Sequence, residues 1–513
     1  MGKDGAPPAA TVDAGGEPRR PTSRRRIGLL GGSALFAAML VLPPPAGLES
    51  EAWRVAAMAA LMAVWWMTEA IPVAATALLP IALFPLLRVS GVTEAAAPYG
   101  NPLIFLFLGG FVIARAVERW NLHRRIALAV LAAVGTRPDR LIGGFMLATA
   151  GLSMWVSNTA TTVMMLPIGL SVIGLLHRDI GRTKSGTGED RFALALLLGI
   201  AYSASIGGLA TLIGTPPNAL LAGFMEQTYG VTVGFFQWML VGVPVSAVML
   251  GTAWLLLTRV LFRHSSPEIE GAETLIAGEI AKLGPMRREE KRVVAVFVCV
   301  ALLWVFRPLL AHWLPLTDPG IAVLGALAMF LVPADRWRGV FLLDWDYAKR
   351  LPWGVLLLFG GGLSLARAID DSGLAAWIGE LLTACAGWPA VAIVLLITVI
   401  VVFLTELTSN TATAAVFLPI VASLGVCIGH NPLLFAIPAA LAASCAFMMP
   451  VATPPNAIVF GSGMVTVPQM ARAGFLLNLA AILVIVLATY SLVLLVFGVE
   501  PGIMPEWAIR TRG

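Results

Sequence analysis

A short polar sequence occurs twice in this chain, and its side chains suit an anion and a small cation. Ser157-Asn158-Thr159 recurs as Ser409-Asn410-Thr411, 409 − 157 = 252 residues later. Hydroxyl and amide groups donate hydrogen bonds to carboxylate oxygens, and oxygen atoms freed at broken helices coordinate sodium. No Lys, Arg or His lies within ten residues of either triplet. An anion bound there would therefore need a positive charge brought with it, because buried charge is costly.

A second polar motif follows each triplet and predicts a break in a helix. Thr215-Pro216-Pro217-Asn218 recurs as Thr453-Pro454-Pro455-Asn456, 453 − 215 = 238 residues later. Consecutive prolines remove two backbone donors and clash with the preceding turn. The freed helix N-termini carry a partial positive charge that suits a carboxylate. We expect the two triplets and the two breaks to meet at one site near the middle of a membrane.

These motifs lie in a chain whose composition indicates membrane helices. Its 513 residues are 58% hydrophobic and 12% charged, with a mean hydropathy of +0.87, whereas soluble proteins carry about 25% charged residues. Uncharged stretches such as Phe192–Leu212, Phe235–Leu257 and Phe475–Phe497 reach the length of a spanning helix, which is roughly 20 residues. Such stretches are too long for barrel strands, so we expect an all-α polytopic membrane protein.

The order of the apolar segments predicts about eleven transmembrane helices and two re-entrant hairpins, at 141–176 and 390–428, with the triplets at the hairpin tips. Matching segments begin near residues 102 and 353 as the fourth and ninth crossings, and this odd separation makes the two repeats inverted. The register change of 252 − 238 = 14 residues is assigned to the polar stretch His177–Asp190. The expected units are a disordered basic cytoplasmic tail (1–26), N-terminal scaffold helices (27–88), a first repeat (89–262), a cytoplasmic linker (263–292), a second repeat with the last helix (293–498) and an extracytoplasmic tail (499–513).

Charge placement predicts the orientation. Lys and Arg concentrate at the N-terminus and in alternate loops, and the intervening loops carry mainly acidic residues. By the positive-inside rule the N-terminus is cytoplasmic. Basic residues in short loops orient helices, so we expect no binding to nucleic acid. The partners that we expect are lipid, sodium and a small di- or tricarboxylate anion, with sodium as a coupling ion and no cofactor.

Other interpretations remain open at this stage. Ser, Thr and Asn also join helices in membranes, although two triplets each coupled to a proline break favour binding. Glu406, three residues before Ser409, either tunes a cation site or caps the hairpin. An intramembrane enzyme would need a catalytic dyad, which we do not find in the sequence, and a channel fits paired occluding hairpins less well than alternating access.

At these residues the chain resembles the divalent anion/sodium symporter family. The resemblance covers Trp65 to Phe497 and is carried by Trp65-Trp66-Met67-Thr68-Glu69-Ala70-Ile71-Pro72, the two triplets and the two proline motifs. It implies a homodimer in which each protomer has a scaffold domain and a transport domain that moves like an elevator. It also implies a multi-pass protein of the bacterial inner membrane.

The resemblance further implies which residues bind. The first sodium site would use Ser153, Ser157, Asn158 and the Gly214 carbonyl, and the second would use Thr405, Asn410 and the Ala452 carbonyl. The substrate would contact residues of both triplets and both breaks: Asn158, Thr159, Ser409, Asn410, Thr411, Thr215, Pro216, Thr453 and Pro454. The function expected is sodium-coupled import of C4-dicarboxylates such as succinate, malate or fumarate. Alternatives are a sodium-independent dicarboxylate exchanger, which would need a fixed positive side chain at the site, or a sodium-coupled citrate or sulfate carrier.

Overall fold

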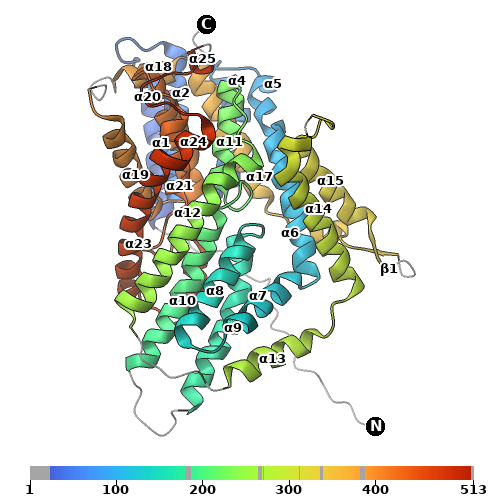
Figure 1. Ribbon diagram of the computed structural model, residues 1–513. Helices are drawn as coiled ribbons and strands as arrows, with labels where there is room; N and C mark the ends of the chain where they lie inside the picture. The colour runs from blue at the N-terminus through green and yellow to red at the C-terminus, as the bar shows by residue number, and fades with distance from the viewer. Residues whose placement is uncertain are drawn as a thin grey trace, which may run out of the picture.

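The protein is built from helices, with one small two-stranded sheet in the described part of the chain (Figure 1). The computed structural model describes residues 23–179, 187–263, 269, 271–310, 312–335, 339–381 and 387–509. The expected all-α membrane fold is confirmed. The central part of the enlarged loop His177–Asp190, residues 180–186, lies outside the described residues.

The chain begins with helices that precede the first hairpin. Their bounds are α1 (Ser23–Val41), α2 (Ser50–Thr68), α3 (Val73–Thr76), α4 (Leu79–Leu86), α5 (Val92–Ala96), the 3₁₀ turn η1 (Ala97–Gly100), α6 (Pro102–Arg119) and α7 (Leu122–Val134). These bounds differ from the sequence-based expectations in two places. The arginines at positions 24–26, expected in a disordered tail, form the first turns of α1. In the segment expected to cross near residues 70–88, two short helices, α3 and α4, follow one another with Ala77 and Leu78 between them, and Pro80 lies in the first turn of α4.

The first repeat contains a helical hairpin followed by a broken helix. The hairpin consists of α8 (Pro138–Ser153) and α9 (Asn158–Asp179), and the broken helix of α10 (Thr187–Gly208) and α11 (Pro216–Tyr229). After these come α12 (Phe235–Leu255), the π-helical turn η2 (Leu256–Leu261), α13 (Ala272–Leu283), α14 (Arg288–Leu310), α15 (Asp318–Leu331), the antiparallel strands β1 (Pro333–Asp335) and β2 (Val340–Phe341), and α16 (Trp345–Ala348).

The second repeat has the same order of elements. After α17 (Trp353–Asp371) and α18 (Leu374–Leu381), a hairpin is formed by α19 (Ala390–Thr405) and α20 (Asn410–Cys427). The broken helix consists of α21 (Leu433–Ala443) and α22 (Pro454–Phe460). The chain then continues through α23 (Val467–Ala488), the π-helical turn η4 (Thr489–Val493), α24 (Leu494–Phe497) and α25 (Glu506–Ile509). Both hairpins and both breaks thus occur where the polar motifs predicted them.

The two repeats pack across each other. Within each repeat the hairpin contacts the first half of its broken helix, α8 and α9 on α10, and α19 and α20 on α21. The second halves exchange partners, because α11 packs on α20 and α22 packs on α9. In Figure 1, α8 and α9 lie in the lower half of the molecule and α18 and α20 near its upper end, as expected for repeats that enter from opposite sides.

Close packing around the hairpins depends on small residues. A side chain at Gly207 on α10 would collide with the backbone of Ala150 on α8, and one at Gly474 on α23 with the backbone of Phe447 and Met448. Glycine at such positions lets helix backbones approach closely in a membrane. The first hairpin is therefore held against α10, and the unwound segment before α22 is held against α23.

Seven helices in the described part are long and apolar enough to cross a membrane, or eight if the bent pair Val92–Gly100 and Pro102–Arg119 is one span. Two of the seven are hairpin arms, Asn158–Leu175 and Asn410–Cys427. Shorter apolar helices, among them Asp318–Leu331 and Ala390–Thr405, add to the apolar part. The chain is therefore a multi-pass membrane protein, and the total of eleven crossings stays a prediction.

Candidate functional site

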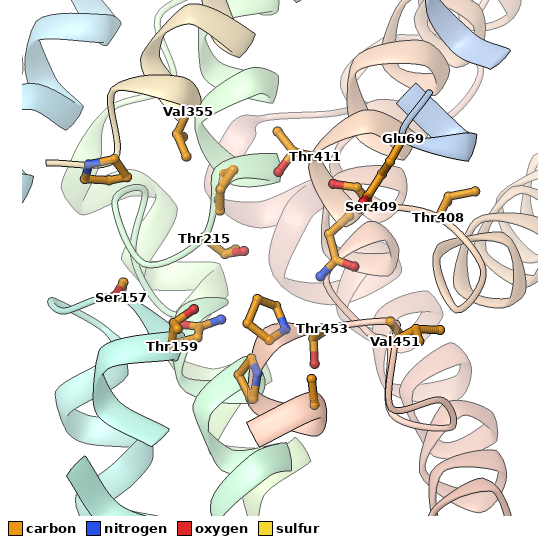
Figure 2. A pocket seen from close by; sticks show the side chains of 18 of the residues that line it. Glu69, Ser157, Thr159, Thr215, Val355, Thr408, Ser409, Thr411, Val451 and Thr453 are labelled. Carbon is orange, nitrogen blue, oxygen red and sulfur yellow. The ribbon is translucent and has the colours of Figure 1, made fainter. Parts of the chain in front are cut away.

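Both hairpin tips and both breaks line one cavity with a volume of about 1530 Å³. Figure 2 shows Ser157 and Thr159 on one side of the hollow, Ser409 and Thr411 on the other, and Thr215 and Thr453 between them. Twelve of the fourteen residues expected at the site lie in its wall: Ser157, Asn158, Thr159, Gly214, Thr215, Pro216, Ser409, Asn410, Thr411, Ala452, Thr453 and Pro454. The other two, Ser153 and Thr405, are fully buried behind the tips.

The first hairpin tip is held by the side chain of Ser153. Its hydroxyl lies 2.6 Å from Asn158 Oδ1 and 2.7 Å from the Ala204 carbonyl oxygen of α10. At Gly208 an added side-chain carbon would lie 3.0 Å from Asn158 Oδ1 and 3.1 Å from the Gly214 carbonyl oxygen. The Asn158 side chain and the Gly214 carbonyl therefore flank the same point. These neutral oxygens belong to the set expected for the first sodium.

The second hairpin repeats this arrangement. The Thr405 hydroxyl lies 2.9 Å from Asn410 Oδ1 and 2.8 Å from the Ala443 carbonyl oxygen of α21. A hydroxyl at the end of the first arm thus fixes the asparagine that starts the second arm in both hairpins. The two asparagines begin α9 and α20, so they lie at helix N-termini, where backbone N–H groups and the helix dipole favour an anion.

Two asparagines that the sequence analysis did not assign brace the breaks. Asn218 Nδ2 donates to the carbonyl oxygens of Gly208, Leu209 and Thr211 at 3.2, 3.3 and 2.8 Å. Asn456 Nδ2 donates to those of Ala446 and Met449 at 3.2 and 3.1 Å. Both side chains are fully buried. The signal was present, because each is the last residue of the repeated Thr-Pro-Pro-Asn motif.

The carboxylate of Glu406 supports the break in the second repeat. Glu406 Oε1 accepts hydrogen bonds from the backbone N–H groups of Phe447 and Met448 at 2.6 and 2.9 Å, and Oε2 accepts one from Met449 at 3.1 Å. Asn478 Nδ2 of α23 donates to Oε1 at 2.8 Å. Whether Glu406 also tunes a cation site stays a prediction, but all four of these donors lie outside its own hairpin. These contacts support the unwound segment before α22.

The corresponding position in the first repeat is occupied by Met154, at 406 − 252 = 154. There the hydroxyl of Thr211 donates to the Met154 carbonyl oxygen at 2.6 Å. The same link between hairpin and break is therefore made by neutral groups in one repeat and by a buried carboxylate in the other. The two repeats therefore differ in charge at this position behind the hairpin tips.

Three arginines among the described residues line the cavity, although none is near a triplet in sequence. They are Arg24 and Arg25 of α1 and Arg115 of α6, and Glu69 and Glu118 line the cavity with them. Arg115 pairs with Glu118 at 2.6 Å and Arg25 with Glu69 at 3.5 Å. No cationic residue is near a triplet in the sequence, but the folded chain brings these three arginines to the cavity that the triplets line. Only the folded chain brings the first turn of α1 to the cavity.

Comparison with known proteins agrees with this geometry. The sequence profile described as "Sodium:sulfate symporter transmembrane region" matches residues 24–497. A protein of Staphylococcus saprophyticus named sodium-dependent dicarboxylate transporter SdcS is 46% identical over 483 residues, which cover 92% of each chain. The protein of the same name from Staphylococcus aureus is 46% identical over 481 residues, again 92% of each chain.

Two solved transporter structures share the fold. The YdaH transporter of Alcanivorax borkumensis superposes with a TM-score of 0.56 at 15% identity, covering 93% of this chain and 97% of that one. The efflux pump MtrF of Neisseria gonorrhoeae gives a TM-score of 0.54 at 13% identity, with 91% and 92% covered. At these identities the likeness concerns the arrangement of helices alone.

Proposed function

This chain belongs to the sodium:sulfate symporter family, a family of transporters, and from that premise we propose that it is a sodium-coupled importer of C4-dicarboxylates such as succinate, malate or fumarate. The observation that carries the proposal is the shared cavity, whose wall contains both hairpin tips and both breaks. The relatives named as sodium-dependent dicarboxylate transporters support both the coupling ion and the substrate class.

The geometry supports separate roles for the residues of the site, some binding sodium and others binding the substrate. Asn158 with the Gly214 carbonyl, and Asn410 with the Ala452 carbonyl, supply oxygens for two sodium ions, with Ser153 and Thr405 behind them. Ser157 adds its oxygen to the first site. Thr159, Ser409 and Thr411 then donate to the carboxylates of the substrate, together with the polar groups at Thr215-Pro216 and Thr453-Pro454. Sodium binds first, orders the tips and offsets the charge of the dianion.

The transport cycle follows from the architecture. We assign the two hairpins and two broken helices to a moving domain, and the N-terminal helices within 27–88 to a scaffold that forms a homodimer. The moving domain carries the site across the membrane as an elevator. The cavity wall includes the first turn of α1, the end of α6 and Pro352 before α17, which all lie on the predicted cytoplasmic side. We therefore place the N-terminus and the cavity mouth at the cytoplasmic face of the bacterial inner membrane.

One observation favours a second candidate. A sodium-independent exchanger needs a fixed positive side chain near the anion, and Arg24, Arg25 and Arg115 line the cavity. Two of the three are paired with carboxylates, so their charge is largely offset. The sodium-coupled function remains our choice, because the oxygens behind both tips form two matched sets.

Uptake by the purified chain in proteoliposomes tests the proposal. With an inward sodium gradient, radiolabelled succinate should accumulate, and uptake should fall to background when choline replaces sodium. Unlabelled malate and fumarate should compete more strongly than citrate or sulfate. Equal uptake in choline would establish the exchanger, and sulfate as the strongest competitor would establish an oxyanion carrier.

A further inference from the structure

The first turn of α1 brings a cationic side chain to the cavity. Arg24 lies in the cavity wall together with Met67 at the end of α2 and Leu407 at the second hairpin tip. These three residues come from segments that are far apart in sequence. The sequence analysis placed Arg24 in a disordered tail, so its position is a property of the fold.

Close packing of α1 on α2 fixes this position. Residues 24, 28 and 32 are spaced four apart and share one face of the helix. A side chain at Gly32 would lie 2.8 Å from the Trp65 ring, and one at Gly28 would collide with Thr68. Because both glycines allow α1 to lie directly against α2, the next turn of the same face places Arg24 beside the end of α2.

The guanidinium of Arg24 bridges two parts of the cavity mouth. Its Nη2 atom donates to the carbonyl oxygen of Met67 at 2.5 Å and to that of Leu407 at 2.6 Å. Leu407 precedes Thr408 and Ser409, which also line the cavity. One side chain therefore connects the end of α2 to the tip that carries the second triplet.

Arg24 differs from the other two arginines of the cavity in its partners. Arg25 and Arg115 each face a carboxylate, whereas the hydrogen bonds that the described residues offer to Arg24 come from backbone carbonyls. Hydrogen bonds between a guanidinium and a carboxylate are stronger than those to neutral acceptors. A carboxylate that enters the cavity is thus a better partner for Arg24 than the carbonyls that it has now.

From these contacts we infer that Arg24 is a substrate-sensing residue at the cavity mouth. A carboxylate of the incoming dianion takes the guanidinium away from the Leu407 carbonyl, and this exchange releases the second hairpin tip from α2. Arg24 also attracts the anion into the cavity, an effect that weakens as ionic strength rises. The inference rests on the proposed function, because it requires a carboxylate substrate and a mobile hairpin.

The test compares Arg24→Gln, Arg24→Lys and Arg26→Gln in inside-out membrane vesicles, which expose the cytoplasmic face. Arg26 is on the same turn of α1 but outside the cavity wall, so it is the matched control. Sodium-driven succinate uptake is measured against succinate concentration, at constant sodium and at two ionic strengths set with choline chloride. For Arg24→Gln we expect the half-saturating succinate concentration to rise about fivefold, the size expected for an exposed ion pair, with a weaker dependence on ionic strength.

Arg24→Lys should restore most of both properties, because it keeps the charge, and Arg26→Gln should behave as wild type. Arg24→Gln indistinguishable from Arg26→Gln in both properties would overturn the inference. Arg24→Lys as defective as Arg24→Gln would also overturn it, because the role would then be one of packing rather than charge. Failure of the proposed function is a separate result, in which the wild-type chain itself shows no sodium-dependent succinate uptake.

Discussion

The Ser153 hydroxyl lies 2.6 Å from Asn158 Oδ1 across the tip of the first hairpin. The corresponding residues 252 positions later, Thr405 and Asn410, are 2.9 Å apart across the second tip. Each hydroxyl also lies within hydrogen-bonding distance of a carbonyl oxygen of the adjoining broken helix, that of Ala204 at 2.7 Å or of Ala443 at 2.8 Å. The repeat thus extends from the sequence to individual hydrogen bonds, and each pair forms the back wall of a proposed sodium site.

Removal of either hydroxyl, that of Ser153 or of Thr405, should therefore weaken the binding of sodium more than the binding of the anion. In Ser153→Ala and in Thr405→Val we expect the half-saturating sodium concentration to rise about tenfold, as the loss of one polar contact of about 1.4 kcal/mol implies. At saturating sodium the half-saturating succinate concentration should change little. Sodium activation curves in proteoliposomes measure both quantities. A change in succinate dependence alone would assign these hydroxyls to the anion instead.

The asparagines at the tips should be indispensable. Asn158→Ala and Asn410→Ala each remove an oxygen from a proposed sodium site and an amide from the substrate site, so succinate uptake should fall to background while the protein remains folded. The matched control is Ser171→Ala on α9, since this exposed hydroxyl bonds only to the Pro167 carbonyl of its own helix among the described residues. Normal uptake by either asparagine variant would contradict the site assignment.

Glu406→Gln should loosen the second break. The carboxylate accepts four N–H donors, from Phe447, Met448, Met449 and Asn478. An amide places an NH₂ group against at least one of them, and the loss of charge-assisted bonds costs about 1.5–3 kcal/mol. We expect a lower thermal midpoint of the detergent-solubilised protein together with weaker transport.

The control for this change is Glu500→Gln, at an exposed position after α24. It should leave both the thermal midpoint and transport unchanged. If Glu406→Gln were as stable as Glu500→Gln, the buried carboxylate would not be supporting the unwound segment.

Packing of the first hairpin against α10 gives a prediction about stability. Gly207→Ala would drive its new methyl group into the backbone of Ala150, and overpacking of this kind costs about 1–3 kcal/mol. Gly151→Ala on α8 is the control, because nothing lies within 4 Å of the added carbon. Fluorescence-detected size-exclusion after heating should show a lower midpoint for the first variant alone. Equal midpoints would mean that α8 can shift away from α10 without loss.

The sequence predicted the hairpins and the breaks because both depend on local chemistry. Paired prolines break a helix wherever they occur, and a polar triplet between short apolar arms turns at its own position. The repeated motifs and the family resemblance pointed to the residues of the cavity wall. Asn218 and Asn456 end the same repeated motif, but their bracing role became visible only in the structure. Glu406 was visible as a rare acid, but its role depends on backbone N–H groups about 40 residues away in sequence.

The cationic part of the cavity could not be predicted in the same way. Arg24 reaches the site only because Gly28 and Gly32 bring α1 against α2 and because α2 ends beside the second tip. Such contacts arise from the packing of helices distant in sequence, on which periodicity and local spacing carry no information. The crossing expected near residues 70–88 stays a prediction, because the apolar stretch Val73–Leu86 runs through both α3 and α4.

The most direct test of the shared site uses one cysteine at each hairpin tip. In a chain whose native Cys299, Cys385, Cys427 and Cys445 are replaced, Thr159→Cys and Thr411→Cys are labelled separately with a maleimide, with Lys282→Cys on α13 as the exposed control. Succinate with sodium should slow labelling at both tips, succinate with choline at neither, and the control should not respond. Protection of one tip without the other would contradict a single site built from both repeats.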